Sequence, residues 1–163
     1  MATRYRLKII EKFKWVAQAS KTVKLYKAKK YEEALVYANK SYETVFKVFS
    51  SEHVNVAKVL YNLVALNNEL GNYTEAREYG KEAIKIYENI YGEDLSLVDY
   101  LEVVLPVCDK LNDEEYKEEL LDKIDRCKGI TEEYNGKIDE VDEVDEVDEV
   151  DEVDEICENN KID

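Results

Sequence analysis

Proline, glycine and histidine are scarce in this sequence of 163 residues, which contains one Pro, five Gly and one His. This composition fits a helical protein better than a sheet protein, whose turns draw on Gly and Pro. Apolar runs are short as well. None of them approaches the ~18 residues that a membrane-spanning helix needs. A helical protein without a membrane span is therefore expected.

Cysteine is also sparse, and its spacing matches no metal or disulfide motif. The three thiols, Cys108, Cys127 and Cys157, are odd in number and include no Cys-x-x-Cys pair. This pattern argues against a disulfide framework or a zinc site and suits a reducing compartment. The basic start of the chain is similar to a mitochondrial presequence, but it is rich in Lys rather than Arg or Ser and continues into the next segment. We expect a cytoplasmic protein, with the nucleus as the alternative.

A strong helical pattern lies between Val54 and Tyr91. Apolar residues recur there at three- and four-residue spacing on both sides of Gly71, which predicts amphipathic helices at 54–70 and 74–91. Gly71 and Asn72 tolerate left-handed backbone angles and predict a tight turn between the two helices. This stretch is therefore predicted to form an antiparallel helical hairpin.

Copies of this hairpin lie on both sides of it. A shift of 42 residues places Tyr73–Ala76 on Tyr31–Ala34. A period of this length, with two helices in each repeat, is typical of an α-solenoid, whose stacked units bury apolar faces that no single hairpin can bury. Three units are predicted at about 7–50, 54–91 and 95–128, with helices at about 7–29, 31–49, 54–70, 74–91, 96–111 and 113–127.

Two of these helices have features of their own. Pro106 lies inside the fifth helix, where it removes a backbone donor, so we expect a kink there. The first helix carries an apolar set that predicts its packing face, formed by Ile9, Ile10, Phe13, Val16, Ala19, Val23 and Tyr26.

Several short segments resemble known repeat families. Gly71–Ala76, which reads Gly-Asn-Tyr-Thr-Glu-Ala, and Tyr61–Leu63 resemble the tetratricopeptide repeat. The connectors Ser51–His53 and Tyr91–Asp94 resemble those of the 42-residue repeats in kinesin light chains. The C-terminal helical domain of SET-and-MYND lysine methyltransferases is a closer match, because its hairpins end in a segment similar to Leu95–Leu101. The resemblance implies an all-α fold, a right-handed solenoid of about three antiparallel helical hairpins.

The net charge of -15 is distributed unevenly along the chain. Residues 1–31 carry a net charge of +9, residues 32–131 carry -10 and residues 132–163 carry -14. Near the C-terminus, apolar residues recur at a strict period of three, and most of the residues between them are Asp and Glu. In an α-helix or a strand, this period does not gather the apolar side chains on one face. Disorder or transient helix is therefore expected. We therefore expect a helical repeat domain at 1–130 and a low-complexity acidic tail at 131–163.

Two roles are open for this tail. It can act as a passive, solubilising segment, or it can contact the basic first helix of the same chain and shield a binding groove from acidic ligands. In the second case, removing residues 132–163 raises the affinity for an acidic peptide at low salt. The lysines available for the contact are Lys8, Lys12, Lys14, Lys21, Lys24, Lys27, Lys29 and Lys30.

No pattern in the sequence indicates catalysis. His53, the single histidine, lies in a connector between two units, where we expect it to cap or pack a helix. The sequence has no Gly-rich phosphate loop, no metal-ligand helix motif and no nucleophile beside a base, so neither an enzyme, a cofactor nor a metal site is predicted. Nucleic acid is a weak alternative, because the acidic tail would oppose the phosphate backbone.

A protein-interaction module is the remaining class. The resemblance implies that the first helix of each hairpin lines a groove for an extended or helical peptide. The candidate groove residues are Tyr26, Lys27, Lys58, Tyr61, Asn62 and Asn68, with Val16, Ala19, Val23, Ala65 and Glu69 beside them and Leu101, Val104 and Cys108 in the third unit.

We therefore expect a non-catalytic adaptor or scaffold that binds an unidentified protein or peptide. The alternative is a fragment or degenerate relative of a SET-and-MYND lysine methyltransferase that lacks the catalytic domain, since no part of this chain resembles a SET domain or a MYND zinc module.

Overall fold

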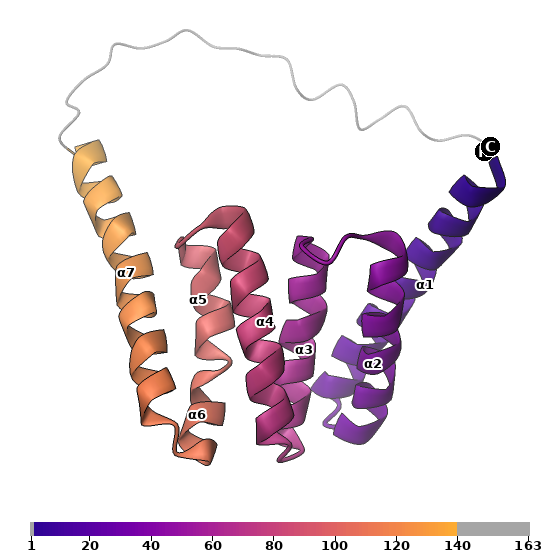
Figure 1. The fold of residues 1–163 in the computed structure, drawn as a ribbon, viewed down its shortest axis with the longest axis horizontal. Helices are drawn as coiled ribbons and strands as arrows, with labels where there is room; N and C mark the ends of the chain where they lie inside the picture. Colours follow the sequence, from indigo (N-terminus) through magenta and orange to yellow (C-terminus); the bar gives the residue numbers. More distant parts are fainter. Residues whose placement is uncertain (1, 140–163) are drawn as a thin grey trace, which may run out of the picture.

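The computed structural model describes the backbone of residues 2–139 and the side chains of residues 6–129. Between residues 2 and 139 the chain forms seven α-helices and no strand. The helices stack side by side as antiparallel hairpins, and α1 and α7 lie at opposite ends of the row (Figure 1). The predicted all-α solenoid is confirmed. The helices are α1 (Ala2–Lys27), α2 (Tyr31–Val48), α3 (Val54–Glu69), α4 (Tyr73–Tyr91), α5 (Leu95–Glu102), α6 (Leu105–Leu111) and α7 (Glu114–Asp139).

A residue with positive φ occupies each of the three hairpin turns. These residues are Lys29 at φ 56°, Gly71 at φ 79° and Asn112 at φ 53°. Left-handed backbone at this place ends a helix and reverses the chain, and Gly adopts it without the steric cost that Lys bears. The three turns repeat at intervals of 42 and 41 residues, which shows the predicted period directly.

The connectors between hairpins cap the helix that follows them. The His53 side chain accepts a hydrogen bond from the Asn55 backbone N–H at 3.1 Å, which satisfies one of the free donors at the start of α3. Its ring also stacks on Phe49, with centroids 4.3 Å apart. The predicted capping and packing role of His53 is confirmed. Asp94 caps α5 in the same way, through Ser96 and Leu97.

The core is continuous through the row of hairpins. Its fully buried leucines come mainly from the middle of the stack, with Leu60, Leu63 and Leu66 in α3 and Leu97 and Leu101 in α5. The helix α3 has neighbours on both sides, because it packs against α2 and α4 and touches α1. The central hairpin is therefore the best-buried unit, as its regular three- and four-residue spacing of apolar side chains predicts.

The predicted fifth helix is broken rather than kinked. The helix α5 ends at Glu102, and α6 begins at Leu105 with Pro106 at its first turn. Pro106 cannot donate the backbone hydrogen bond that a continuous helix would make to the Glu102 carbonyl. The chain instead tightens at this point, where Val104 and Val107 donate to carbonyls three residues earlier. The prediction of one kinked helix at 96–111 is wrong.

Both terminal helices are longer than predicted. The helix α1 begins at Ala2 rather than near Leu7, and α7 continues to Asp139 rather than ending near Cys127. The predicted domain boundary at residue 130 falls inside α7, and residues 131–139 are helical, which is one of the two states expected for them. The rest of the predicted tail, residues 140–163, lies outside the described residues.

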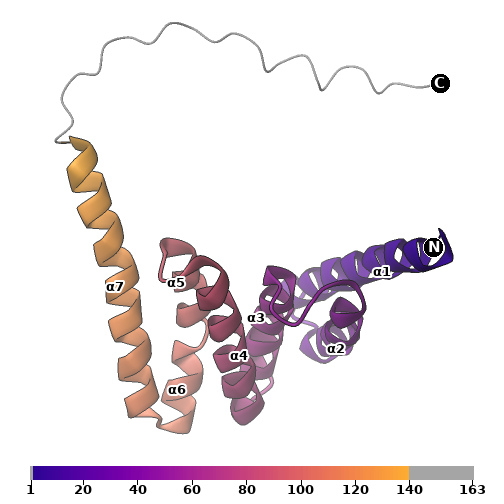
Figure 2. The same cartoon turned by 45° about the horizontal axis from the view of Figure 1, so that its top comes forward.

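The predicted packing face of α1 is wrong for most of its residues. Ile9, Ile10, Phe13, Val16 and Val23 are at least 40% exposed, whereas Thr22 and Leu25, on the other side of the helix, are buried. At its N-terminus α1 is also longer than its partner, since α1 has 26 residues and α2 has 18. The N-terminal turns of α1 therefore extend past the end of α2, and the α1–α2 hairpin is also inclined to the upright helices of the stack (Figure 2).

Candidate functional site

Two adjoining clefts lie across the first helices of the hairpins. One has a volume of ≈ 300 Å³ between α1 and α3, and the other has a volume of ≈ 330 Å³ between α3 and α5. They share Tyr61 and Asn62, so together they form one continuous depression, called the groove below. It is lined by Thr22, Val23, Tyr26, Lys27, Lys58, Tyr61, Asn62, Ala65, Leu66, Asp99, Tyr100 and Val103.

Helical spacing explains why these residues share one surface. In α3, Lys58, Tyr61, Asn62 and Ala65 follow one another at intervals of three, one and three residues, which places them on one face. The other face of α3 carries the buried leucines of the core. One helix therefore supplies both the floor of the groove and the centre of the stack.

Most of the predicted groove residues come together in the structure. Tyr26 and Lys27 line the cleft between α1 and α3, Lys58 lines the other cleft, and Tyr61 and Asn62 line both. Asn68 lines neither cleft and is half-buried near the end of α3. A ligand role for any of these residues stays a prediction.

The third-unit residues predicted for the groove are wrong. Leu101, Val104 and Cys108 are fully buried in the core. The helix α3 begins at Val54 and α5 at Leu95, a shift of 41 residues rather than the 42 or 43 used to transfer the register. An error of one or two residues rotates the chosen position by about 100–200° around a helix, from the exposed face to the core.

The lining residues that the sequence prediction missed are Thr22, Leu66, Asp99, Tyr100 and Val103. A signal for two of them is present in the connectors. His53 and Asp94 are both helix caps, and they are also 41 residues apart. Aligning the units on these caps places Asp99 opposite Lys58 and Val103 opposite Asn62.

Tyr61 is held in the groove by other tyrosines. Its ring meets Tyr100 edge to face with centroids 5.4 Å apart, and Tyr100 packs against Tyr87 at 4.5 Å. The Tyr87 hydroxyl in turn donates to Ser96 Oγ at 2.6 Å. Such aromatic pairs favour a fixed ring position beyond their simple burial. The groove therefore presents a firm aromatic surface at its centre.

The groove carries charges of both signs. Lys27 and Lys58 are exposed at its edge, and Asp99 is exposed on the α5 side. The pKa of Tyr61 is raised, first by burial and then by Asp99 and Glu102. A raised pKa keeps the Tyr61 hydroxyl protonated, so it can donate a hydrogen bond to a ligand.

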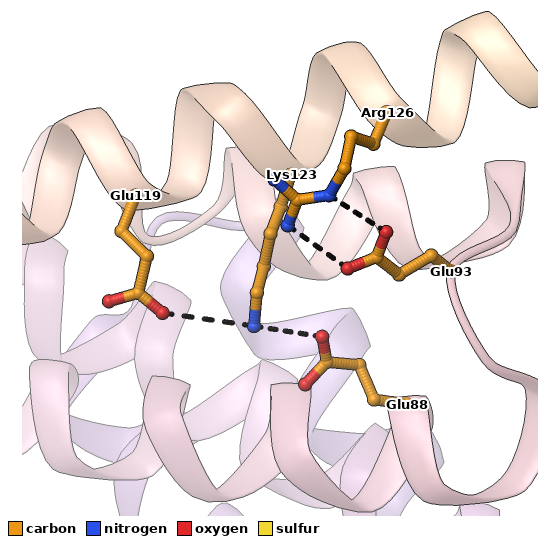
Figure 3. Close-up of polar contacts among 5 residues, drawn as sticks. All are labelled: Glu88, Glu93, Glu119, Lys123 and Arg126. Atoms are coloured by element: carbon orange, nitrogen blue, oxygen red, sulfur yellow. Dashed lines mark hydrogen bonds and ion pairs between the residues drawn. The ribbon is translucent and has the colours of Figure 1, made fainter.

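A third cleft lies at the other end of the stack. It has a volume of ≈ 250 Å³ between α4 and α7 and is lined in part by Lys81, Lys85 and Lys123. Lys123 Nζ pairs with Glu88 at 2.8 Å and lies 3.8 Å from Glu119 (Figure 3). The pairs of Lys123 therefore join α7 to α4 across this cleft.

Metal-binding groups are not assembled in the described part of the chain. Residues 6–129 contain no cluster of three or more His, Cys, Asp or Glu that could hold a metal ion. Cys108 and Cys127 are buried, and burial raises the pKa of each thiol, so neither is a reactive thiolate at neutral pH. Among the described helices, none is long and apolar enough to cross a membrane.

Comparison with known proteins agrees with the fold. Residues 24–89 match the family model of the tetratricopeptide repeat, from the last turn of α1 almost to the end of α4. No curated protein matches the chain significantly. The finer resemblance to kinesin light chains and to SET-and-MYND methyltransferases stays a prediction. Residues 24–89 are therefore similar to the tetratricopeptide repeat, and the described chain forms an all-α solenoid of stacked hairpins.

Proposed function

We propose that the chain is a non-catalytic interaction module that binds a peptide segment of a partner protein in the groove. Tetratricopeptide repeats generally mediate protein–protein interaction, which favours this class of function. The observation that carries the proposal is the position of Tyr61 and Asn62, which line both clefts and join three first helices into one surface.

The lining suggests the chemistry of the peptide. Val23, Ala65 and Leu66 make the cleft between α1 and α3 largely apolar, with Tyr26 at its side. This cleft suits an aliphatic or aromatic side chain. Asn62 offers an amide that can donate to and accept from a peptide backbone. Lys58 and Asp99 in the second cleft favour a peptide that carries charges of both signs.

A peptide selected from a random library can test the proposal while the natural partner is unidentified. The library is displayed on phage and selected on the intact chain, and the affinity of synthetic copies is measured by calorimetry. Tyr61→Ala/Asn62→Ala should weaken binding by about 30-fold, the effect of losing an interface residue worth ~2 kcal/mol.

A matched variant controls for nonspecific effects. Tyr37→Ala/Asn39→Ala changes the same two residue types on α2, outside the groove, and should leave the affinity unchanged. Far-UV circular dichroism verifies that both variants keep their helices. Equal affinity of the Tyr61/Asn62 variant and the wild type would show that the groove is not the binding site.

A further inference from the structure

One side of α1 is exposed where the equivalent side of α3 is buried. The turn residues Lys29 and Gly71 set a shift of 42 residues between the two helices. The aligned pairs, exposed in α1 and buried in α3, are Lys14 with Val56, Ala17 with Val59, Lys21 with Leu63 and Lys24 with Leu66. Both helices have a hairpin partner, but among the described helices only α3 also has one before it, which is α2.

This side of α1 is therefore the place where a preceding helix would pack. The exposed Ile10 lies on it too, one turn before Lys14. We call the side formed by Ile10, Lys14, Ala17, Lys21 and Lys24 the open α1 face.

The helix α7 has an open side at the other end of the stack (Figure 1). Its turn residue Asn112 follows Gly71 by 41 residues, and this shift aligns α7 with α4. The aligned pairs, exposed in α7 and buried in α4, are Leu121 with Gly80, Asp125 with Ile84 and Lys128 with Tyr87.

In α4 this side packs against the helices that follow. Tyr87 lies on Tyr100 of α5 with ring centroids 4.5 Å apart, and a Cβ at Gly80 would meet Val104. The equivalent side of α7 is therefore the place where a following helix would pack. We call it the open α7 face, and its exposed residues are Glu114, Glu118, Leu121, Asp122, Asp125 and Lys128.

The two open faces carry opposite charges. The open α1 face has three lysines, and the open α7 face has four carboxylates and one cation, Lys128, which lies 3.6 Å from Glu102. Lys14 lies 4.0 Å from the half-buried Glu11. Among the described side chains, Lys21, Lys24 and the four carboxylates are in no ion pair.

Opposite charges at the two ends are not what solubility alone requires. Polar outer faces keep the ends of a repeat stack soluble, and like charges on both ends would also keep copies apart. Opposite charges instead attract the last helix of one copy to the first helix of another. Two α1 faces or two α7 faces would repel each other, so a symmetric pairing of either end is disfavoured.

The stack itself contains the kind of contact that would join two copies. The helix α2 packs against α3, and α4 packs against α5 and α6, so each unit presents its second helix to the first helix of the next unit. The helix α7 is the second helix of the last unit, and α1 is the first helix of the first unit. We propose that copies of this chain associate head to tail, with the open α7 face of one copy against the open α1 face of the next.

This contact is mainly electrostatic. Its apolar part is small, because it rests on Ala17, Ile10 and Leu121. Exposed ion pairs are weak singly and are screened by salt, so the association should be weak and salt-sensitive. At about 0.1 M salt the Debye length is ~10 Å, which screens the repulsion between distant charges of two copies more than the attraction between charges in contact. Since the two faces differ from each other, each added copy leaves one open face of each kind, and the assembly grows as an open row.

Sedimentation velocity of the intact chain tests the association. At about 0.1 M salt, the weight-average sedimentation coefficient should rise steadily with protein concentration, and in about 1 M salt it should return to the monomer value. A monomer value at every concentration in the lower salt would overturn the proposal. So would an assembly that stops at the dimer, because that result indicates a closed symmetric contact.

Charge reversal identifies the two faces. Lys21→Glu/Lys24→Glu on α1 and Glu118→Lys/Asp125→Lys on α7 should each raise the dissociation constant by roughly tenfold or more, because each gives both ends charges of the same sign. All four side chains are exposed, so folding should be retained, and circular dichroism checks this. If the α7 variant associates as the wild type does, α1 binds another acidic segment and the proposal fails.

A chain that carries all four changes has the charges of its two ends exchanged and keeps the net charge of -15. It should associate again, and an equimolar mixture of the two double variants should do so as well. Lys85→Glu/Lys110→Glu is the control, since it changes the net charge as much as the α1 variant does at exposed positions of α4 and α6, and it should leave the association intact. If neither the exchanged chain nor the mixture associates, the two faces do not meet.

Discussion

Arg126 of α7 holds Glu93 with two parallel hydrogen bonds, from Nε to Oε2 at 2.9 Å and from Nη2 to Oε1 at 3.0 Å. Glu93 lies in the connector between α4 and α5, so this pair joins the last helix to the turn that begins the third unit (Figure 3). Lys123, one turn earlier in α7, reaches Glu88 of α4. A bidentate Arg–carboxylate pair fixes direction as well as distance. The terminal helix is therefore aligned by polar contacts in addition to its buried Leu120 and Ile124.

Glu93→Gln should lower the melting temperature slightly at neutral pH, by about 1–3 °C, because exposed pairs contribute little. The Arg126 hydrogen bond holds the pKa of Glu93 below its ordinary value. A lowered folded-state pKa stabilises the fold above the unfolded-state value near 4.3, and this stabilisation is lost as the pH falls through the folded-state pKa. The melting temperatures of wild type and variant should therefore converge as the pH drops below about 4.

The exposed Glu52 provides the control for this experiment. Glu52→Gln changes the same charge away from α7 and should leave the melting temperature near the wild-type value throughout. A temperature difference between wild type and Glu93→Gln that persists at pH 3 would contradict the role assigned to the ion pair.

Gly80 of α4 should not tolerate a larger side chain. A Cβ at this position would lie 2.5 Å from Val104 Cγ2 and 3.3 Å from Cγ1 of the same side chain. Gly80→Ala should therefore destabilise the fold by about 1–3 kcal/mol, measured by urea denaturation. Gly129→Ala is the matched change in α7, where a Cβ meets nothing within 4 Å, and it should stabilise by about 0.5–1 kcal/mol.

A double variant separates overpacking from other effects. In Gly80→Ala/Val104→Ala the clash is relieved, so the loss of stability should be smaller than the sum of the two single losses. If the losses of stability in the two single variants simply add in the double variant, contact with Val104 is not what limits the size of the side chain at position 80.

Much of the fold is predictable from sequence because each hairpin turn carries its own signal. Gly71 and Asn72 mark the central turn, and apolar spacing marks both helices around it. The break at Pro106 is harder to foresee, since proline in a helix pattern produces either a kink or a new helix start, and only local packing decides between them. The charge repulsion that predicts disorder likewise sets no exact residue at which α7 ends.

The groove residues are predictable only where the residue shift that aligns one unit with the next is correct. The register through the central hairpin places Tyr26, Lys27, Tyr61 and Asn62 at the clefts. The shift from α3 to α5 is 41 residues, two fewer than the shift of 43 that placed Leu101 opposite Lys58, and Leu101 therefore lies in the core. The exposure of Ile9, Phe13, Val16 and Val23 on α1 escaped prediction for another reason. Apolar spacing shows that a helix has an apolar face, but it does not show whether a neighbouring helix covers that face.

Tyr100 should make the fold sensitive to alkaline pH. Burial raises the pKa of its hydroxyl, and Tyr87, Tyr61 and Asp99 raise it further. A raised folded-state pKa stabilises the fold below the unfolded-state value near 10, and this stabilisation is lost as the pH rises further. Tyr100→Phe cannot ionise, so its stability in urea should fall less than that of wild type between pH 8 and pH 11.

Tyr91, which is 50% exposed, provides the control for alkaline sensitivity. Tyr91→Phe should follow the wild-type pH profile more closely than Tyr100→Phe does. If Tyr100→Phe loses as much stability as wild type at pH 11, ionisation of Tyr100 is not what weakens the stack there.

The acidic residues between 140 and 155 should weaken the binding of an acidic peptide in the groove. Residues 140–155 consist of Asp, Glu and Val alone, so their charge is negative throughout. Replacing these Asp and Glu residues by Asn and Gln should raise the affinity for an acidic selected peptide at low salt, because like charges repel. The gain should shrink in 1 M salt, where the Debye length falls to about 3 Å.

A selected peptide without charged residues provides the control, because residues 140–155 cannot repel it by charge. Its affinity should be the same for the wild type and the neutralised variant at low salt. If the gain for the acidic peptide persists undiminished in 1 M salt, charge repulsion by residues 140–155 does not explain it.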